Sequence, residues 1–164
     1  MGKVCELKIE DIKTLATKSL LDRFGENLEA VVLFGSIARK GAAEQSEIDY
    51  IVVIHNLPKG LVRRRFIVYD ALTPILREFK RDVSVIEVDA EDIGRQITPL
   101  LINIAHDGII LYDKHGKIQE FFKRIRSAVK NADLVRYETR DGKYGWKPSR
   151  ELKPGEVFIV QLED

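Results

Sequence analysis

The chain has 164 residues, of which 45% are apolar and 32% charged, so it is long enough to bury a core and too apolar to be disordered. Its 27 basic and 26 acidic side chains leave a net charge of +1, which excludes a global field that would draw it to nucleic acid or membranes. One cysteine, Cys5, excludes an internal disulfide, and no run approaches the roughly 18 apolar residues of a membrane span. We therefore expect a cytoplasmic protein, neither exported nor embedded in a membrane.

The first half of the chain alternates helical and strand-like patterns. Apolar residues at three-to-four spacing predict an amphipathic helix that ends at Gly25, and the next apolar run predicts a buried strand ending before Gly35. A further long helix should bend at Pro74. The predicted elements are a helix at 10–24, a strand at 30–34, a short helix at 36–39, a strand at 47–54, a helix at 62–79 and a strand at 82–88.

In the second half, Asp89 and Asp92 are candidate caps for a helix that Pro99 interrupts and Gly108 ends. A short strand at 109–112 and an amphipathic helix at 117–130 follow. Beyond residue 132, aromatic and charged residues alternate with Gly and Pro up to a strand-like run at 157–162. We expect an α/β (α+β) fold, in which helices pack on a mixed β-sheet over residues 1–131 and a small C-terminal β appendage, residues 132–164, packs on that domain.

The candidate functional motif is VVLFGSIARKGAAEQSEIDYIVV at residues 31–53. It consists of a strand, the turn Gly35-Ser36, ten residues, and then Glu47 and Asp49 separated by one apolar residue. Side chains two apart on a strand project from the same face, so these carboxylates should lie side by side. Two such acids repel each other unless a cation joins them.

Carboxylate pairs of this kind suit Mg²⁺ or Mn²⁺, which complete their shells with water and substrate phosphates. Gly35 permits close approach of a phosphate to the backbone, Ser36 supplies a hydroxyl donor, and the N–H groups that open the next short helix point toward an anion. Arg39 and Lys40, one turn on, are placed to neutralise terminal phosphates. The residues thus predict a site for a metal-bound nucleotide.

Each feature also has a simpler interpretation. Gly-Ser alone is an ordinary strand-to-helix turn, and an acid pair that begins a strand can be a solvated edge. The spacing between the two favours a ligand site, because an acid followed by the buried-looking run IVVI is costly without a partner. Asp82 is either a functional acid or a strand-start residue paired with Arg81.

This arrangement resembles the signature of the DNA polymerase β nucleotidyltransferase superfamily, in particular its small, single-domain minimal nucleotidyltransferases. The resemblance implies that Gly35 and Ser36 bind the triphosphate of ATP or another nucleoside triphosphate, and that Glu47 and Asp49 hold two divalent metal ions. It further implies that Asp82 is the third acid, which completes the metal site and helps to activate the incoming hydroxyl. Position 47 departs from the usual pattern, because most members carry Asp where this chain has Glu.

The C-terminal half, with TPLLINIAHDGIILYD and the later WKP and LKPGEVF, resembles archaeal members whose genes lie beside a HEPN-domain protein. That resemblance implies transfer of a nucleoside monophosphate, AMP from ATP foremost, to an acceptor hydroxyl on a HEPN toxin partner or on RNA. Transfer to a small molecule such as an aminoglycoside is the alternative within catalysis, for which the chain leaves little room. A scaffold with weak or lost catalysis, which binds its partner stoichiometrically, is the alternative of another class.

Overall fold

The core of the fold is a four-stranded mixed sheet with the order β3-β2-β1-β4. In this computed structural model, residues 7–95 and 97–162 are described. β1 runs antiparallel to both of its neighbours, β2 and β4, whereas β2 and β3 are parallel. The strands are β1 (Leu28–Phe34), β2 (Ile48–Ile54), β3 (Val83–Asp89) and β4 (Ile109–Asp113). The expected mixed sheet with packed helices is therefore confirmed.

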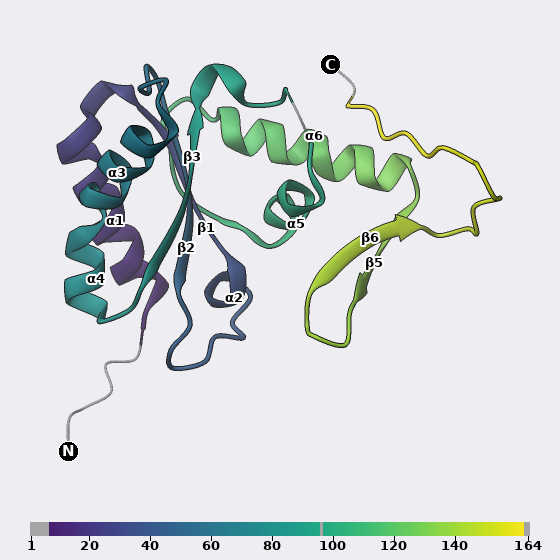
Figure 1. Ribbon diagram of the computed structural model, residues 1–164, viewed down its shortest axis with the longest axis horizontal. Coiled ribbons are helices and arrows are strands. Elements are labelled where there is room, and N and C mark those ends of the chain that lie inside the picture. Colours follow the sequence, from purple (N-terminus) through teal and green to yellow (C-terminus); the bar gives the residue numbers. More distant parts are fainter. Residues whose placement is uncertain (1–6, 96, 163–164) are drawn as a thin grey trace.

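Helices cover both faces of this sheet (Figure 1). One face packs against α1, α3 and α4, and the other against α5 and α6. Alternate residues of β1 and β2 belong to the two apolar cores, which explains why these strands are almost continuously apolar. The helices are α1 (Ile9–Phe24), α2 (Gly35–Ala38), α3 (Leu61–Ala71), α4 (Thr73–Phe79), α5 (Pro99–Asp107) and α6 (Lys117–Asn131), with the short 3₁₀ turns η1 (Gly25–Asn27) and η2 (Ala90–Asp92).

Two helix predictions were wrong in the same way, because each proline lies in the first turn of a helix, where a bend or an interruption was expected. The helix predicted at 62–79 is two helices, and Pro74 lies in the first turn of α4. Likewise Pro99 opens α5, whose first turn is capped by the Thr98 side chain accepting from Leu101 N–H. Asp89 does cap a turn, but only the 3₁₀ turn η2. Proline fits the first helical position because the backbone N–H there has no intrahelical partner.

The C-terminal region forms a hairpin of β5 (Leu134–Glu138) and β6 (Tyr144–Pro148), paired antiparallel and packed beside α5 (Figure 1). The strand expected at 157–162 is absent, and those residues run without regular secondary structure. The apolar alternation there has a different cause, since Leu162 packs on the core while Val157 and Ile159 are exposed. The division of the chain at residue 131 stays a prediction.

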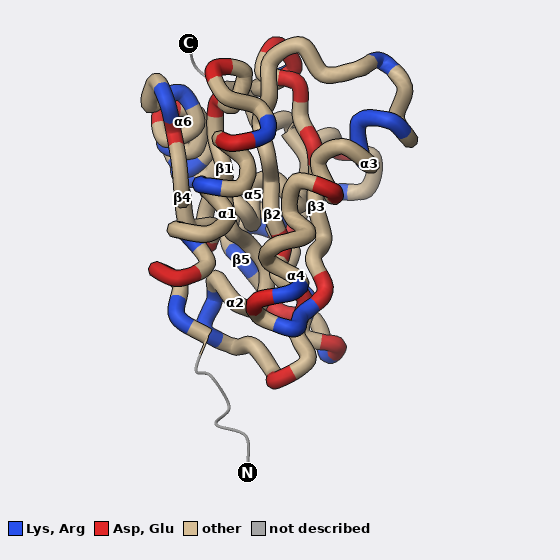
Figure 2. Tube along the Cα trace, turned by 90° about the vertical axis from the view of Figure 1, so that its left-hand side faces the viewer, with Lys and Arg blue, Asp and Glu red and all other residues tan. Residues whose placement is uncertain are grey.

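Charges of both signs are interspersed along the trace, in keeping with the near-zero net charge, and the densest basic run, residues 63–65, lies on α3 (Figure 2). None of the described helices is long and apolar enough to cross a lipid bilayer.

Glu29 is a charged side chain within the core, with only 1% of its surface exposed. His55 Nε2 lies 2.8 Å from its Oε2, and His115 Nδ1 lies 2.9 Å from its Oε1. Although burial opposes ionisation, hydrogen bonds from the two imidazoles hold the pKa of the Glu29 carboxyl below its usual value. His55 and His115 therefore stabilise a buried carboxylate of the core. Glu29 lies at the start of β1, at the opposite end of the strand from the Gly35-Ser36 turn.

Candidate active site

The Gly35-Ser36 turn and the Asp49 carboxylate are in direct contact. β1 ends at Phe34, the residue paired with Asp49 on β2, and α2 begins at Gly35. Gly35 has a φ of +76°, and a Cβ built on it would lie 2.1 Å from Oδ2 of Asp49. Only glycine avoids this overlap, so the carboxylate packs on bare backbone at the start of α2. The structure thus brings together the turn and the acid that lie thirteen residues apart in the chain.

Asp49 and Glu47 belong to one face of β2, since Ile48 and Tyr50 are fully buried on the other. Asp49 is half-buried, and Glu47 lies exposed just before the strand begins. Burial first, and then the negative charge of Glu47, raise the pKa of the Asp49 carboxyl above its usual value. A hydrogen bond with Ser84 and the charge of Arg39 act in the opposite direction.

Asp82 lies one residue before β3 and beside this pair. Its carbonyl oxygen accepts a 2.9 Å hydrogen bond from Ile48 N–H, and the parallel register pairs Ile48 with Val83 and Asp49 with Ser84. Residue 82 is therefore level with Glu47, on the face that carries Asp49, with an exposed side chain. Ser84, which the sequence did not single out, makes the contact with Asp49.

Glu47 and Asp49 are better placed to share a divalent cation than the three acids Glu47, Asp49 and Asp82 are. Glu47 and Asp49 offer hard oxygen ligands from one face. Burial first, and then the charge of Glu47, raise the pKa of Asp49, and a cation between the two carboxylates would offset the repulsion between them. Among residues 7–95 and 97–162, no three His, Cys, Asp or Glu side chains gather closely enough to hold a metal ion. The part of Asp82 as third ligand stays a prediction.

Arg81 fixes the loop that leads into this acid pair. Its Nη1 donates to the carbonyl oxygens of Ala43 at 3.1 Å and Ser46 at 3.0 Å. The loop therefore meets β3 immediately before Glu47. Sequence reasoning considered Arg81 only as a possible partner of Asp82, and a long-range contact between a loop and an arginine leaves no local signal by which it could be found.

The basic residues predicted to meet phosphate lie at the end of α2. Arg39 and Lys40 are both exposed, and Lys40 has a φ of +58° where the chain turns away from the helix. The Arg39 guanidinium lies 5.3 Å from the centre of the Tyr144 ring in β6. Ser36 is half-buried, and its carbonyl accepts a 3.0 Å hydrogen bond from Gly41 N–H. Arg39 is thus next to the acid pair and the hairpin at once.

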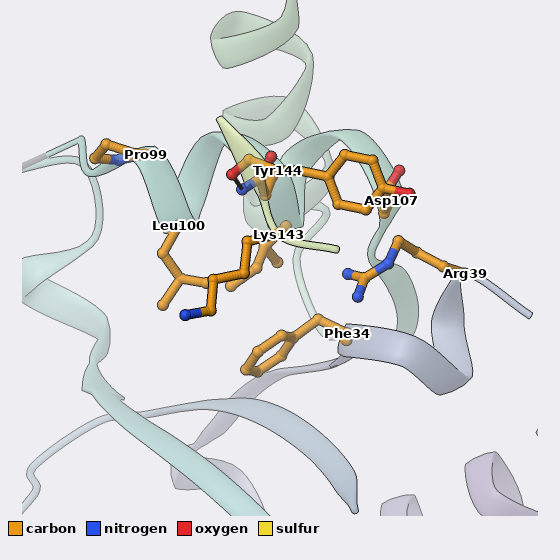
Figure 3. Close-up of a pocket in the computed structure, with 10 residues that line it drawn as sticks. Phe34, Arg39, Pro99, Leu100, Asp107, Lys143 and Tyr144 are labelled. Carbon is orange, nitrogen blue, oxygen red and sulfur yellow. Dashed lines mark hydrogen bonds between the residues drawn. The ribbon is translucent and has the colours of Figure 1, made fainter. Parts of the chain in front are cut away.

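A cavity of about 320 Å³ opens directly beside the Gly35 turn (Figure 3). Its walls come from α2, from α5 and from the hairpin, which are far apart in the sequence. The lining residues are Phe34, Gly35, Arg39, Pro99, Leu100, Asn103, Ile104, Asp107, Lys143 and Tyr144. Sequence reasoning missed the contributions of α5 and the hairpin, because only tertiary packing places them here.

Comparison with known proteins identifies the family and the fold. The sequence model of the family described as Polymerase beta, Nucleotidyltransferase matches residues 16–117. A protein of Methanocaldococcus jannaschii that carries the provisional name protein adenylyltransferase MJ1305 is 31% identical over 109 residues, which is 66% of this chain and 74% of that protein.

Solved structures share the fold at low sequence identity. A toxin-antitoxin crystal structure with AMP-PNP matches with a TM-score of 0.51 and 19% identity, over 73% of this chain and 87% of that one. Spectinomycin adenyltransferase AAD(9) from Enterococcus faecialis, with ATP and spectinomycin, matches with a TM-score of 0.54 and 13% identity, over 76% of this chain and 66% of that one. The order of elements and the extent of the family match lead to one conclusion: the chain belongs to the polymerase beta nucleotidyltransferase family.

Proposed function

We propose that this protein transfers a nucleoside monophosphate, AMP from ATP, onto an acceptor hydroxyl in a reaction that depends on Mg²⁺ or Mn²⁺. The observation that carries the proposal is the contact between the Asp49 carboxylate and the backbone of Gly35. It places an acid suited to a divalent cation against a turn suited to phosphate, as transfer from a metal-bound triphosphate requires.

In this proposal, the Gly35-Ser36 turn holds the triphosphate, and Arg39 and Lys40 neutralise its terminal phosphates. Glu47 and Asp49, with Asp82 as the third acid, hold the divalent ions, which when bound stabilise charge on the attacking and leaving oxygens. The acceptor oxygen forms a bond to the α-phosphorus, the bond from that phosphorus to the bridging oxygen breaks, and pyrophosphate leaves. Asp82 takes the proton of the acceptor hydroxyl.

We propose a hydroxyl of a HEPN-domain protein as the acceptor, so that the chain acts as the antitoxin of a toxin-antitoxin pair. Support comes from the M. jannaschii relative, whose provisional name is protein adenylyltransferase. The fold shared with a toxin-antitoxin structure agrees with this choice but does not identify the acceptor. An RNA hydroxyl is the competing acceptor, and the experiment below separates the two.

Two observations favour a second function, that of a binding scaffold with weak catalysis. Glu47 is one methylene longer than the usual acid at its position, and the described acids do not form a group of three. A scaffold of this kind would neutralise its partner by stoichiometric contact and would leave it unmodified.

The test is to purify the protein with the product of its neighbouring gene and to incubate them with Mg²⁺ and ATP labelled at the α- or the γ-phosphate. Transfer of AMP labels the partner from α-labelled ATP only, and Asp49→Asn removes the label. Label on RNA alone identifies the other acceptor. A partner that binds tightly but stays unlabelled supports the scaffold, and a wild-type protein that neither labels nor binds its neighbour refutes both functions.

A further inference from the structure

The β5–β6 hairpin lies outside the 16–117 match to the family, yet it forms a wall of the cavity beside Gly35. We propose that this hairpin is part of the nucleotide site, with Lys143 and Tyr144 contacting the nucleoside triphosphate directly. Figure 3 shows both side chains on the side of the cavity opposite Phe34, with the Tyr144 ring next to Arg39 and the Lys143 side chain extending toward Leu100. This inference rests on the proposed function and adds to it a substrate-binding element that the family domain does not supply.

The hairpin is held in place on α5 by several polar contacts. Arg136 of β5 makes a bidentate ion pair with Asp107, in which Nη1 donates to Oδ1 at 2.9 Å and Nη2 donates to Oδ2. Trp146 Nε1 donates to Asn103 Oδ1 at 2.9 Å, and Asn103 Nδ2 donates to the Tyr144 carbonyl at 3.0 Å. Bidentate pairs and amide bridges fix orientation as well as distance. The wall that carries Tyr144 is therefore a rigid part of the site.

The same contacts determine which groups remain for a ligand. Asn103 uses its amide oxygen and nitrogen on the hairpin, and Asp107 uses both oxygens on Arg136. What faces the cavity is an apolar surface from Phe34, Leu100 and Ile104, the Tyr144 ring, and the cations of Arg39 and Lys143.

Lys143 Nζ pairs with Oδ2 of the exposed Asp141 at 3.0 Å within the hairpin turn, a contact that a phosphate can replace at little cost. Aromatic and apolar surface next to two cations suits a planar base that carries a polyphosphate. The volume, about 320 Å³, lies at the lower end of small-molecule sites. A nucleoside triphosphate matches both kinds of surface, whereas an uncharged acceptor offers no negative charge to Arg39 and Lys143.

The test measures affinity without turnover, by isothermal titration calorimetry with α,β-methylene-ATP and Mg²⁺. Tyr144→Ala and Lys143→Ala should each raise Kd about tenfold. The matched controls are Tyr137→Ala and Lys147→Ala on the same hairpin, neither of which lines the cavity, and they should change Kd less than about twofold. Trp146, the single tryptophan, reports through its fluorescence whether the hairpin stays docked in each variant.

The outcomes separate this inference from the proposed function. If the wild type binds the analogue and Lys143→Ala and Tyr144→Ala bind it equally well, the inference is wrong and the proposed function stands. If those variants keep the affinity but lose transfer, the cavity holds the acceptor, which also overturns the assignment to nucleotide. If the wild type binds no nucleotide, both proposals fall. If Tyr144→Ala undocks the hairpin, the Kd of Lys143→Ala decides the test, because Lys143 is exposed.

Discussion

Gly35→Ala tests whether close contact between turn and acid is the feature that builds this site. Alanine is unfavourable there for two reasons: the backbone φ is +76°, and the alanine Cβ would lie 2.1 Å from Oδ2 of Asp49. The backbone conformation costs a residue with a side chain about 1 kcal/mol. Ordinary contact begins near 3.4 Å, so the Asp49 carboxylate must rotate away from the turn.

Overlap of this kind costs about 1–3 kcal/mol, so the total loss of unfolding free energy should be about 3 kcal/mol. Transfer should fall by about a hundredfold or more, since an error of roughly 1 Å in a catalytic group has that effect. Urea denaturation followed by circular dichroism gives the first quantity, and α-labelled ATP gives the second.

Gly116→Ala is the matched control, because Gly116 has a φ of +71° but open space around its Cβ position. It should lose only the backbone contribution, about 1 kcal/mol, and keep full activity. If Gly35→Ala loses no more stability than Gly116→Ala and still transfers nucleotide, the contact between turn and acid is not what the site depends on.

Three further predictions concern single carboxylates. Asp49→Asn should abolish transfer and raise the unfolding free energy by about 1 kcal/mol, because it removes a half-buried charge and its repulsion with Glu47; a destabilised variant in urea would contradict this. Glu29→Gln should lower the unfolding free energy by about 3 kcal/mol at pH 7. Since folding lowers the pKa of Glu29, this difference should persist above its unfolded pKa of about 4.5 and vanish as the pH falls through the lower folded value. A difference in unfolding free energy that does not change with pH would refute the assignment. Asp107→Asn should weaken hairpin docking by about 2 kcal/mol and red-shift Trp146 fluorescence, whereas the exposed pair member Asp92→Asn should do neither.

The sheet could be predicted from sequence because local patterns determine it. The strands were identified within one or two residues, since buried β-branched runs bounded by Gly or polar residues have few other interpretations. The errors occurred where local signals are ambiguous: proline marks either a break or a first turn, and the run 157–162 has the alternation of a strand but no partner to pair with.

The site residues likewise fall into those that local sequence patterns predict and those that depend on tertiary packing. Gly35, Glu47 and Asp49 could be found because their spacing in the chain follows from one strand-turn-strand unit. Ser84, Tyr144 and the rest of the cavity wall could not, because their places depend on the parallel register of β3 and on how the hairpin docks on α5. Burial of Glu29 was missed for a related reason, since the two histidines that compensate it are distant in sequence.

Binding of a divalent ion together with nucleotide tests the central claim most directly. Titration of Mn²⁺ into the protein, followed by water-proton relaxation with and without α,β-methylene-ATP, measures it independently of any acceptor. We predict strong enhancement that requires the nucleotide in the wild type and is lost in Asp49→Asn. Equal enhancement in the wild type and Asp49→Asn, or none in either, would contradict the assignment of the Asp49–Gly35 contact as the metal-nucleotide site.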